Sequence, residues 1–151
     1  MTLVHEITGD LWTFHTQGEW IAITTNGVIK ANGEAVMGAG LAKAAAQRYP
    51  DLPRVLGQAL RHSGNHPYAF LSTRIITFPT KRHWQHPADL ELIIASMKSV
   101  AHLIEQHNMS RVYLPRVGCG LGQLSWRDVR TAIAPYVTSR CVFVTSLLEI
   151  P

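Results

Sequence analysis

Two short apolar runs in this chain each lead directly into a glycine-rich loop. The first run, Trp20 to Thr24, precedes a loop over residues 26–40. The second run, Val112 to Leu114, is stopped by Pro115 and precedes a glycine loop over residues 118–122. A short run that is apolar on both faces is typical of a central strand in a parallel sheet covered by helices. Ligands of such sheets bind beyond the C-terminal ends of the strands. The two loops therefore favour an α/β fold with a ligand site at that edge.

The remaining segments alternate between strand and helix patterns. We expect further strands over residues 4–7, 68–71, 75–78 and 142–144, and helices over residues 41–49, 52–62, 89–107 and 125–136. A polar loop with two prolines is expected between residues 78 and 89, and Ser125 is expected to cap the last helix. The alternation predicts a single three-layer α/β/α domain over residues 1–151, with a mixed, mostly parallel central sheet.

Composition narrows the class of protein. A chain of 151 residues that is 46% hydrophobic and 16% charged suits one globular domain. No stretch approaches the roughly 18 apolar residues of a membrane span, and polar residues interrupt the N-terminal segment, so neither a span nor a secretory signal is expected. Two cysteines make no disulfide framework, which fits the cytoplasm. The net charge of +4 favours anionic ligands, although a mildly basic surface explains it more simply.

The glycines of both loops can hold phosphate groups. Gly38 and Gly40 precede the helix expected to begin near Leu41, where free N–H groups and the helix dipole attract anions. The segment Gly118 to Gly122 can form a second nest of backbone N–H groups. Two such loops suit a diphosphate. The alternative is that the glycines only form tight turns, but their clustering after two strands exceeds that need.

Other familiar sites fit poorly. No Gly-Lys-Ser or Gly-Lys-Thr sequence marks a P-loop, and the Gly38-x-Gly40 pair lacks the third glycine of a dinucleotide fingerprint. Gly64 separates His62 from His66, so no metal site is expected, and no cofactor is expected either. Cys119 has no histidine near it in sequence to act as its base, so we interpret it as a packing residue and not as a nucleophile.

Four segments together resemble a known family. Ile7–Leu11, Asn32–Ala42 and Leu114–Gly122 resemble, in order and spacing, the ligand-binding motifs of macro domains, and the resemblance covers essentially the whole chain. The motifs Met-Gly-Ala-Gly and Pro-Arg-Val-Gly-Cys-Gly-Leu are similar to one branch, which includes the terminal ADP-ribose protein glycohydrolase and DarG-type proteins that remove ADP-ribose from DNA. Phe78–Trp84 resembles the lysine-bearing loop of the DarG type.

The resemblance implies a set of ADP-ribose contacts. Asp10 would accept a hydrogen bond from the adenine amine, although a turn residue after Gly9 is the alternative. Asn32 would hydrogen-bond the distal ribose, and Ser146 and Leu147 would line the adenine pocket. The diphosphate would be held by the backbone amides of Gly38, Ala39, Gly118, Gly120 and Leu121. The other implied contacts are Leu11, Met37, Gly40, Leu41, Pro115, Cys119 and Gly122.

The resemblance also implies a catalytic residue. Lys81 would attack the anomeric carbon of the distal ribose and give a transient lysyl adduct that water resolves. The alternative is a solvated loop lysine that attracts anionic ligands. The protein-directed glycohydrolase carries an aspartate where this chain has Gly122. That departure favours the DarG-like form of the reaction, in which the lysine acts without this acid.

Three functions remain open. The first is hydrolysis of mono-ADP-ribosyl adducts on DNA or protein, the second is non-catalytic reading of ADP-ribose, and the third is hydrolysis of ADP-ribose 1″-phosphate or O-acetyl-ADP-ribose. The expected partners are ADP-ribose and ADP-ribosylated DNA or protein, and a monomer is expected. Trp84, which follows Lys81 closely, can either stack on a nucleobase or anchor its loop.

Overall fold

A six-stranded sheet forms the centre of the molecule. The computed structural model describes residues 4–146, and in this range the strands lie in the order β1-β6-β5-β2-β4-β3. Every neighbouring pair is parallel except β3 and β4, which are antiparallel. The prediction of a mixed, mostly parallel sheet is therefore confirmed. The strands are β1 His5–Thr8, β2 Trp20–Asn26, β3 Tyr68–Phe70, β4 Ile75–Lys81, β5 Val112–Pro115 and β6 Cys141–Thr145.

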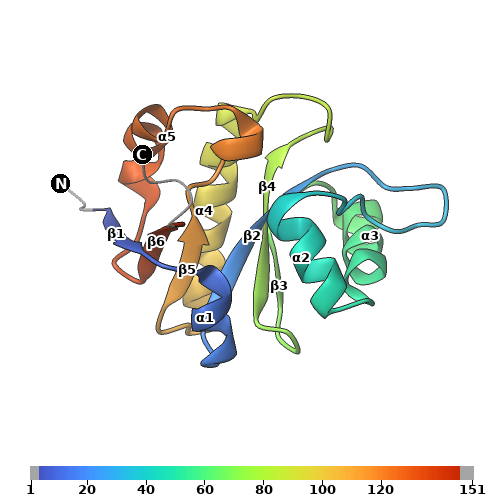
Figure 1. The fold of residues 1–151 in the computed structure, drawn as a ribbon, viewed down its shortest axis with the longest axis horizontal. Coiled ribbons are helices and arrows are strands. Elements are labelled where there is room, and N and C mark those ends of the chain that lie inside the picture. The colour runs from blue at the N-terminus through green and yellow to red at the C-terminus, as the bar shows by residue number, and fades with distance from the viewer. Residues whose placement is uncertain (1–3, 147–151) are drawn as a thin grey trace.

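Helices cover both faces of this sheet, which confirms the three-layer architecture (Figure 1). One face carries α1 (Leu11–Thr16), α2 (Gly40–Arg48) and α3 (Leu52–Ser63). The other carries α4 (Leu90–Gln106) and α5 (Trp126–Ile133). Short 3-10 turns, η1 (Gly120–Gly122) and η2 (Ala134–Tyr136), complete the described elements. None of the helices within residues 4–146 is both long and apolar enough to cross a membrane.

The alternating side chains of the central strands divide the core in two. Ile21 and Ile23 of β2 face α2 and α3, while Ala22 between them faces α4. On β4, Ile75 joins the first core and Phe78 the second, and all of these side chains are fully buried. Burying one such aliphatic or aromatic side chain contributes about 1.5–3 kcal/mol. The central strands are thus fixed on both faces, and so are the loops that leave their C-terminal ends.

The structure differs from the sequence predictions near Lys81. Strand β4 continues through Pro79 to Lys81, so the expected polar loop begins later than predicted. Proline lacks an N–H and is unusual inside a sheet. Here the register between β2 and β4 shifts after Thr25, and the Pro79 carbonyl accepts a hydrogen bond from the Ser96 hydroxyl at 2.8 Å. Lys81 therefore ends a strand and does not lie in a free loop.

Three further differences between the prediction and the structure concern helices. Helix α1 was not predicted, because its six residues are too few to show a helical period. The last helix was expected to reach residue 136, but α5 ends at Ile133 and continues as η2, where Pro135 follows. Ser125 precedes α5 as expected, yet its side chain makes no capping hydrogen bond.

Candidate functional site

A cavity of about 570 Å³ lies at the C-terminal edge of the sheet. Its walls come from the end of β2 and the loop after it, the end of β4 and the loop after it, and the loop after β5. These are the three segments that the sequence singled out. The lining residues are Thr24, Thr25, Asn26, Val36, Gly38, Ala39, Ala42, Thr80, Lys81, Trp84, Gln85, His86, Gly118, Cys119, Leu121, Gly122 and Gln123.

Part of the predicted ligand set lines this cavity, and part lies just behind it. The predicted residues in the wall are Gly38, Ala39, Lys81, Gly118, Cys119, Leu121 and Gly122. Met37 is instead buried in the core beside α2, with 6% of its surface exposed. The structure also leaves Pro115 out of the wall, together with three residues that adjoin it in sequence, namely Gly40, Leu41 and Gly120.

Two of the predicted adenine contacts, Asp10 and Ser146, do not line the cavity. Asp10 caps α1, because its carboxylate accepts a hydrogen bond from the Trp12 N–H at 2.9 Å, and Leu11 is buried in the core. Ser146 is the last residue that the structure describes, and Leu147 lies outside the described residues. The adenine assignments of these residues stay predictions.

Of the two asparagines near this cavity in sequence, Asn26 lines its wall and Asn32 does not, so the predicted ribose contact of Asn32 stays a prediction. Asn32 is exposed at the tip of a hairpin-like turn, where its side chain bonds Glu34, and it does not line the cavity. Asn26, at the end of β2, does line it. The Asn26 amide donates to the Val36 carbonyl at 3.2 Å and its carbonyl accepts from the Val28 N–H at 2.9 Å. Asn26 thus ties together both ends of the loop, and its place directly after an apolar strand was the available signal.

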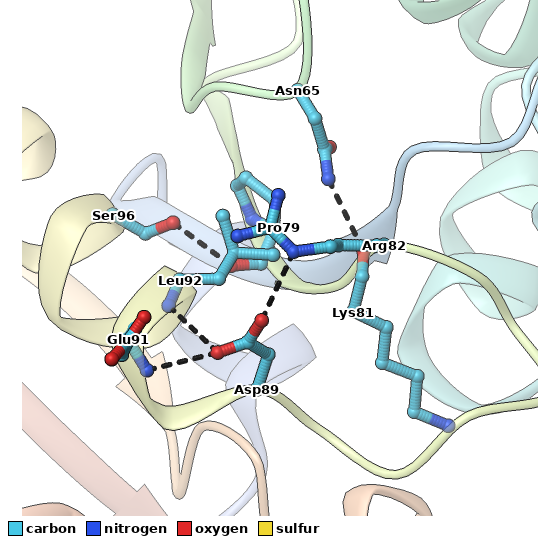
Figure 2. Close-up of polar contacts among 8 residues, drawn as sticks. All are labelled: Asn65, Pro79, Lys81, Arg82, Asp89, Glu91, Leu92 and Ser96. Carbon is cyan, nitrogen blue, oxygen red and sulfur yellow. Dashed lines mark hydrogen bonds and ion pairs between the residues drawn. The ribbon is translucent and has the colours of Figure 1, made fainter.

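Lys81 lies at the junction of two walls. Its ammonium nitrogen is 3.3 Å from the Leu121 carbonyl and 3.4 Å from the Trp84 carbonyl, so the side chain bridges the loop after β4 and the loop after β5. Asn65 donates to the Lys81 carbonyl at 3.2 Å and holds the backbone. Figure 2 shows the Lys81 side chain pointing away from Arg82, which turns toward Asp89.

Asp89 bonds to both residues that flank Lys81 in sequence, Thr80 and Arg82. Its carboxylate pairs with Arg82 at 3.0 Å and accepts the N–H groups of Glu91 and Leu92 at the start of α4 (Figure 2). Its own N–H donates to the Thr80 carbonyl at 2.8 Å. The hydrogen bond from Leu92 and the neighbouring Arg82 guanidinium lower the pKa of Asp89 below the usual carboxyl value. Helix α4 is thereby linked to the residues that flank the lysine.

The start of α2 and the loop after β5 both contribute residues to the cavity wall. Ala39 caps α2 without a side-chain hydrogen bond, so the first-turn N–H groups of this nine-residue helix have no side-chain cap at the cavity wall. Opposite lies the loop that contains Gly118, whose φ of +81° favours glycine. A Cβ on Gly118 would meet Ile93 at 2.4 Å. Both glycine-rich loops that the sequence indicated line this cavity, and their role in binding anions stays a prediction.

The remaining chemistry of the wall is limited. Within residues 4–146 no group of three or more His, Cys, Asp or Glu side chains is placed to hold a metal ion. Cys119 lines the cavity, whereas Cys141 is buried in the sheet, and burial raises the pKa of the Cys141 thiol. Trp84 and Leu121 form an exposed apolar rim, with 49% and 64% of their surfaces accessible.

Comparisons with known proteins agree with this geometry. The family model of the Macro domain matches residues 28–133. A DNA ADP-ribosyl transferase-DNA ADP-ribosyl glycohydrolase fusion protein of Thermosipho africanus is 27% identical over 147 residues, covering 82% of this chain and 36% of that protein. This chain therefore spans about a third of the length of that relative.

Solved structures show the same fold. The macrodomain of Mycobacterium tuberculosis DarG superposes with a TM-score of 0.77 at 27% identity, covering 97% of this chain and 98% of that one. Thermosipho africanus DarTG, solved in complex with ADP-ribose, superposes with a TM-score of 0.78 at 23% identity, covering 97% of this chain and 42% of that one. From its sheet order, its two glycine-rich walls and these matches, the chain belongs to the macro domain family.

Proposed function

We propose that the cavity binds ADP-ribose and that the protein releases ADP-ribose from mono-ADP-ribosylated DNA, with Lys81 as the nucleophile. The observation that carries the proposal is the position of the Lys81 amine, which bridges to Leu121 in the wall that also holds Gly118 and faces the start of α2. The names of the relatives from Thermosipho africanus and Mycobacterium tuberculosis support DNA as the carrier of the adduct.

The diphosphate fits between the two glycine-rich walls. The N-terminus of α2 attracts negative charge, and the loop around Gly118 faces it across the cavity. A cavity of about 570 Å³ also lies within the range of small-molecule sites. This arrangement orients the distal ribose toward the ends of β4 and β2, where Lys81 and Asn26 line the cavity.

Lys81 would act on the anomeric carbon, C1″, of that ribose. A neutral amine attacks C1″, the new C–N bond forms, and the bond from C1″ to the carrier breaks. The carrier leaves with the electron pair and takes up the proton that the amine nitrogen loses, so the adduct is a neutral secondary amine. Water then displaces the lysine. The contacts that hold Lys81, from Asn65 behind and Asp89 beside it, fix the strand end from which the amine reaches the cavity.

Two alternatives share this pocket. A reader of ADP-ribose would need the two phosphate-binding walls but no reactive amine. A small-molecule hydrolase would turn over ADP-ribose 1″-phosphate or O-acetyl-ADP-ribose without a macromolecular carrier. The exposed Trp84 at the rim favours a carrier larger than a phosphate or an acetyl group, because it extends the site beyond the cavity.

The test compares ADP-ribose release from a thymidine-modified DNA strand and a glutamate-modified protein. Wild type, Lys81→Ala and the control Lys98→Ala are measured, since Lys98 lies on α4 over Tyr136 and does not line the cavity. We expect wild type and Lys98→Ala to release ADP-ribose from the DNA, and Lys81→Ala to lose release while still binding ADP-ribose by calorimetry. Binding without release by wild type on either substrate would instead identify a reader or a small-molecule enzyme.

A further inference from the structure

We infer that His86 is the proton-transfer residue that resolves the lysyl adduct. The inference rests on the proposed function of Lys81 and deepens it, because it supplies the second half of the reaction. His86 and Lys81 line the same cavity, and His86 lies in the connection to α4 that begins directly after Lys81, the last residue of β4. The structure gives three reasons for choosing this side chain.

The first reason is the chemistry of the cavity wall. Hydrolysis of an adduct requires a group that takes a proton from water. The described residues that line the cavity include no aspartate or glutamate, and Gly122 offers no side chain. The titratable side chains among them are Lys81, His86 and Cys119. Lys81 is occupied by the adduct, so His86 and Cys119 are left as candidates.

The second reason separates His86 from Cys119. The Cys119 sulfur lies 3.8 Å from the carbonyl of Val117 in its own loop. In the part of the chain that the structure describes, both ring nitrogens of His86 lack a hydrogen-bond partner. Histidine is also the side chain that most readily gains and loses a proton near neutral pH. Neither ring nitrogen is thus engaged by another described residue, and both can contact a water that enters the cavity.

The third reason is that the loop holds His86 in place. The backbone N–H of His86 donates to the backbone carbonyl of His83 at 3.1 Å, and the centroids of the two imidazole rings lie 5.2 Å apart. The Nδ1 atom of His83 accepts a hydrogen bond from the Gln85 backbone N–H at 3.1 Å, and His83 does not line the cavity. Arg82, the charged residue directly before His83, is paired with Asp89. The turn thus presents one of its two histidines to the site.

The resolving step balances as follows. A water oxygen attacks C1″ of the adduct while His86 accepts one of the water protons. The C1″–Nζ bond breaks, its electron pair returns to the Lys81 nitrogen, and His86 delivers the proton to that nitrogen. ADP-ribose leaves with a hydroxyl at C1″, and both side chains return to their starting states. No oxidant, metal or further reactant is required.

The test is chemical rescue under single-turnover conditions with ADP-ribosylated DNA. His86→Ala removes the imidazole, and His83→Asn is the matched control, because asparagine keeps an acceptor for the Gln85 N–H and His83 lies outside the cavity wall. We expect His86→Ala to slow the release of ADP-ribose by about 100-fold or more. Added imidazole should restore a large part of that rate, while His83→Asn should stay near wild type and not respond.

Circular dichroism and ADP-ribose calorimetry check that His86→Ala is folded and binds, which is expected because His86 is exposed. The inference would be overturned if His86→Ala released ADP-ribose at the wild-type rate, or if imidazole did not restore a slowed rate. Either result would leave the role of Lys81 standing. Undiminished release by Lys81→Ala would overturn the proposed nucleophile, and the role of His86 would fall with it.

Discussion

Single glycines show how closely the loop after β2 packs against α3. A Cβ on Gly57, within α3, would lie 1.9 Å from the Gly33 carbonyl oxygen and 3.0 Å from the Ala35 nitrogen. Both neighbours are backbone, so they cannot move aside as the end of a side chain can. Gly38 in the same loop has nothing within 4 Å of its Cβ position. One glycine is therefore required for packing, whereas the other leaves space at the cavity.

We expect Gly57→Ala to lower the free energy of unfolding by about 1–3 kcal/mol or more, because the clash displaces the loop backbone. Gly38→Ala should change that free energy by less than about 0.5 kcal/mol. It should nevertheless weaken ADP-ribose binding, since Gly38 lines the cavity. Urea unfolding and calorimetry measure the two effects. A Gly57→Ala variant as stable as wild type would show that the loop does not depend on this contact.

The two Asn-Gly pairs explain which residues could be predicted from the sequence. Asn26-Gly27 and Asn32-Gly33 are equivalent as turn signals, and both precede the Met-Gly-Ala-Gly motif. The structure separates them because Ile29 pairs with Ala35 and folds the intervening residues into a turn against α3. Asn32 is carried to the tip of this turn, away from the cavity. That long-range packing leaves no local sequence signal.

At the scale of elements, helix α4 links the core to the end of β4, where Lys81 lies. Its N-cap, Asp89, accepts two helix N–H groups and pairs with Arg82. Asp51 precedes α3 in the same way but makes no side-chain capping bond. The two aspartates therefore form a matched pair, of which one is expected to matter for stability.

We expect Asp89→Ala to lower the free energy of unfolding by about 0.5–2 kcal/mol and Asp51→Ala to have little effect. Asp89→Asn should lose less than Asp89→Ala, because asparagine also caps helices. The pKa of Asp89 is lowered in the fold, so its charge stabilises the protein at neutral pH, and this contribution is lost as pH falls through the lowered value. The difference between wild type and Asp89→Asn should shrink in acid. A difference that is independent of pH would contradict this account.

Helices and strands were predictable from the sequence where the apolar pattern is long or where the strand is fully buried. The apolar spacing that predicted a helix over residues 89–107 corresponds to α4, and the runs before the two glycine loops correspond to β2 and β5. Helix α1 was missed because six residues with one cap carry no period. The extension of β4 through Pro79 was missed because proline normally ends a strand, and only the shifted pairing with β2 and the Ser96 hydrogen bond accommodate it.

At the scale of the whole molecule, the order of the sheet assembles the site. Strands β5, β2 and β4 are neighbours, so the loops that follow them meet at one edge although they are far apart in sequence. The contact from Lys81 to Leu121 joins residues 40 positions apart across this edge. Family resemblance indicated these loops, but residues such as Gln85, His86 and Gln123 entered the wall only through tertiary structure.

The measurement that tests the central claim most directly is capture of the lysyl adduct. Wild type is mixed with ADP-ribosylated DNA and treated with borohydride, which reduces the imine formed when the ribose ring of the C1″–Nζ adduct opens. The protein is then digested and mapped by mass spectrometry. We expect an ADP-ribose-derived mass on the peptide that contains Lys81, and none with Lys81→Arg. Full release of ADP-ribose without modification of Lys81, or with modification only at another lysine, would contradict the account.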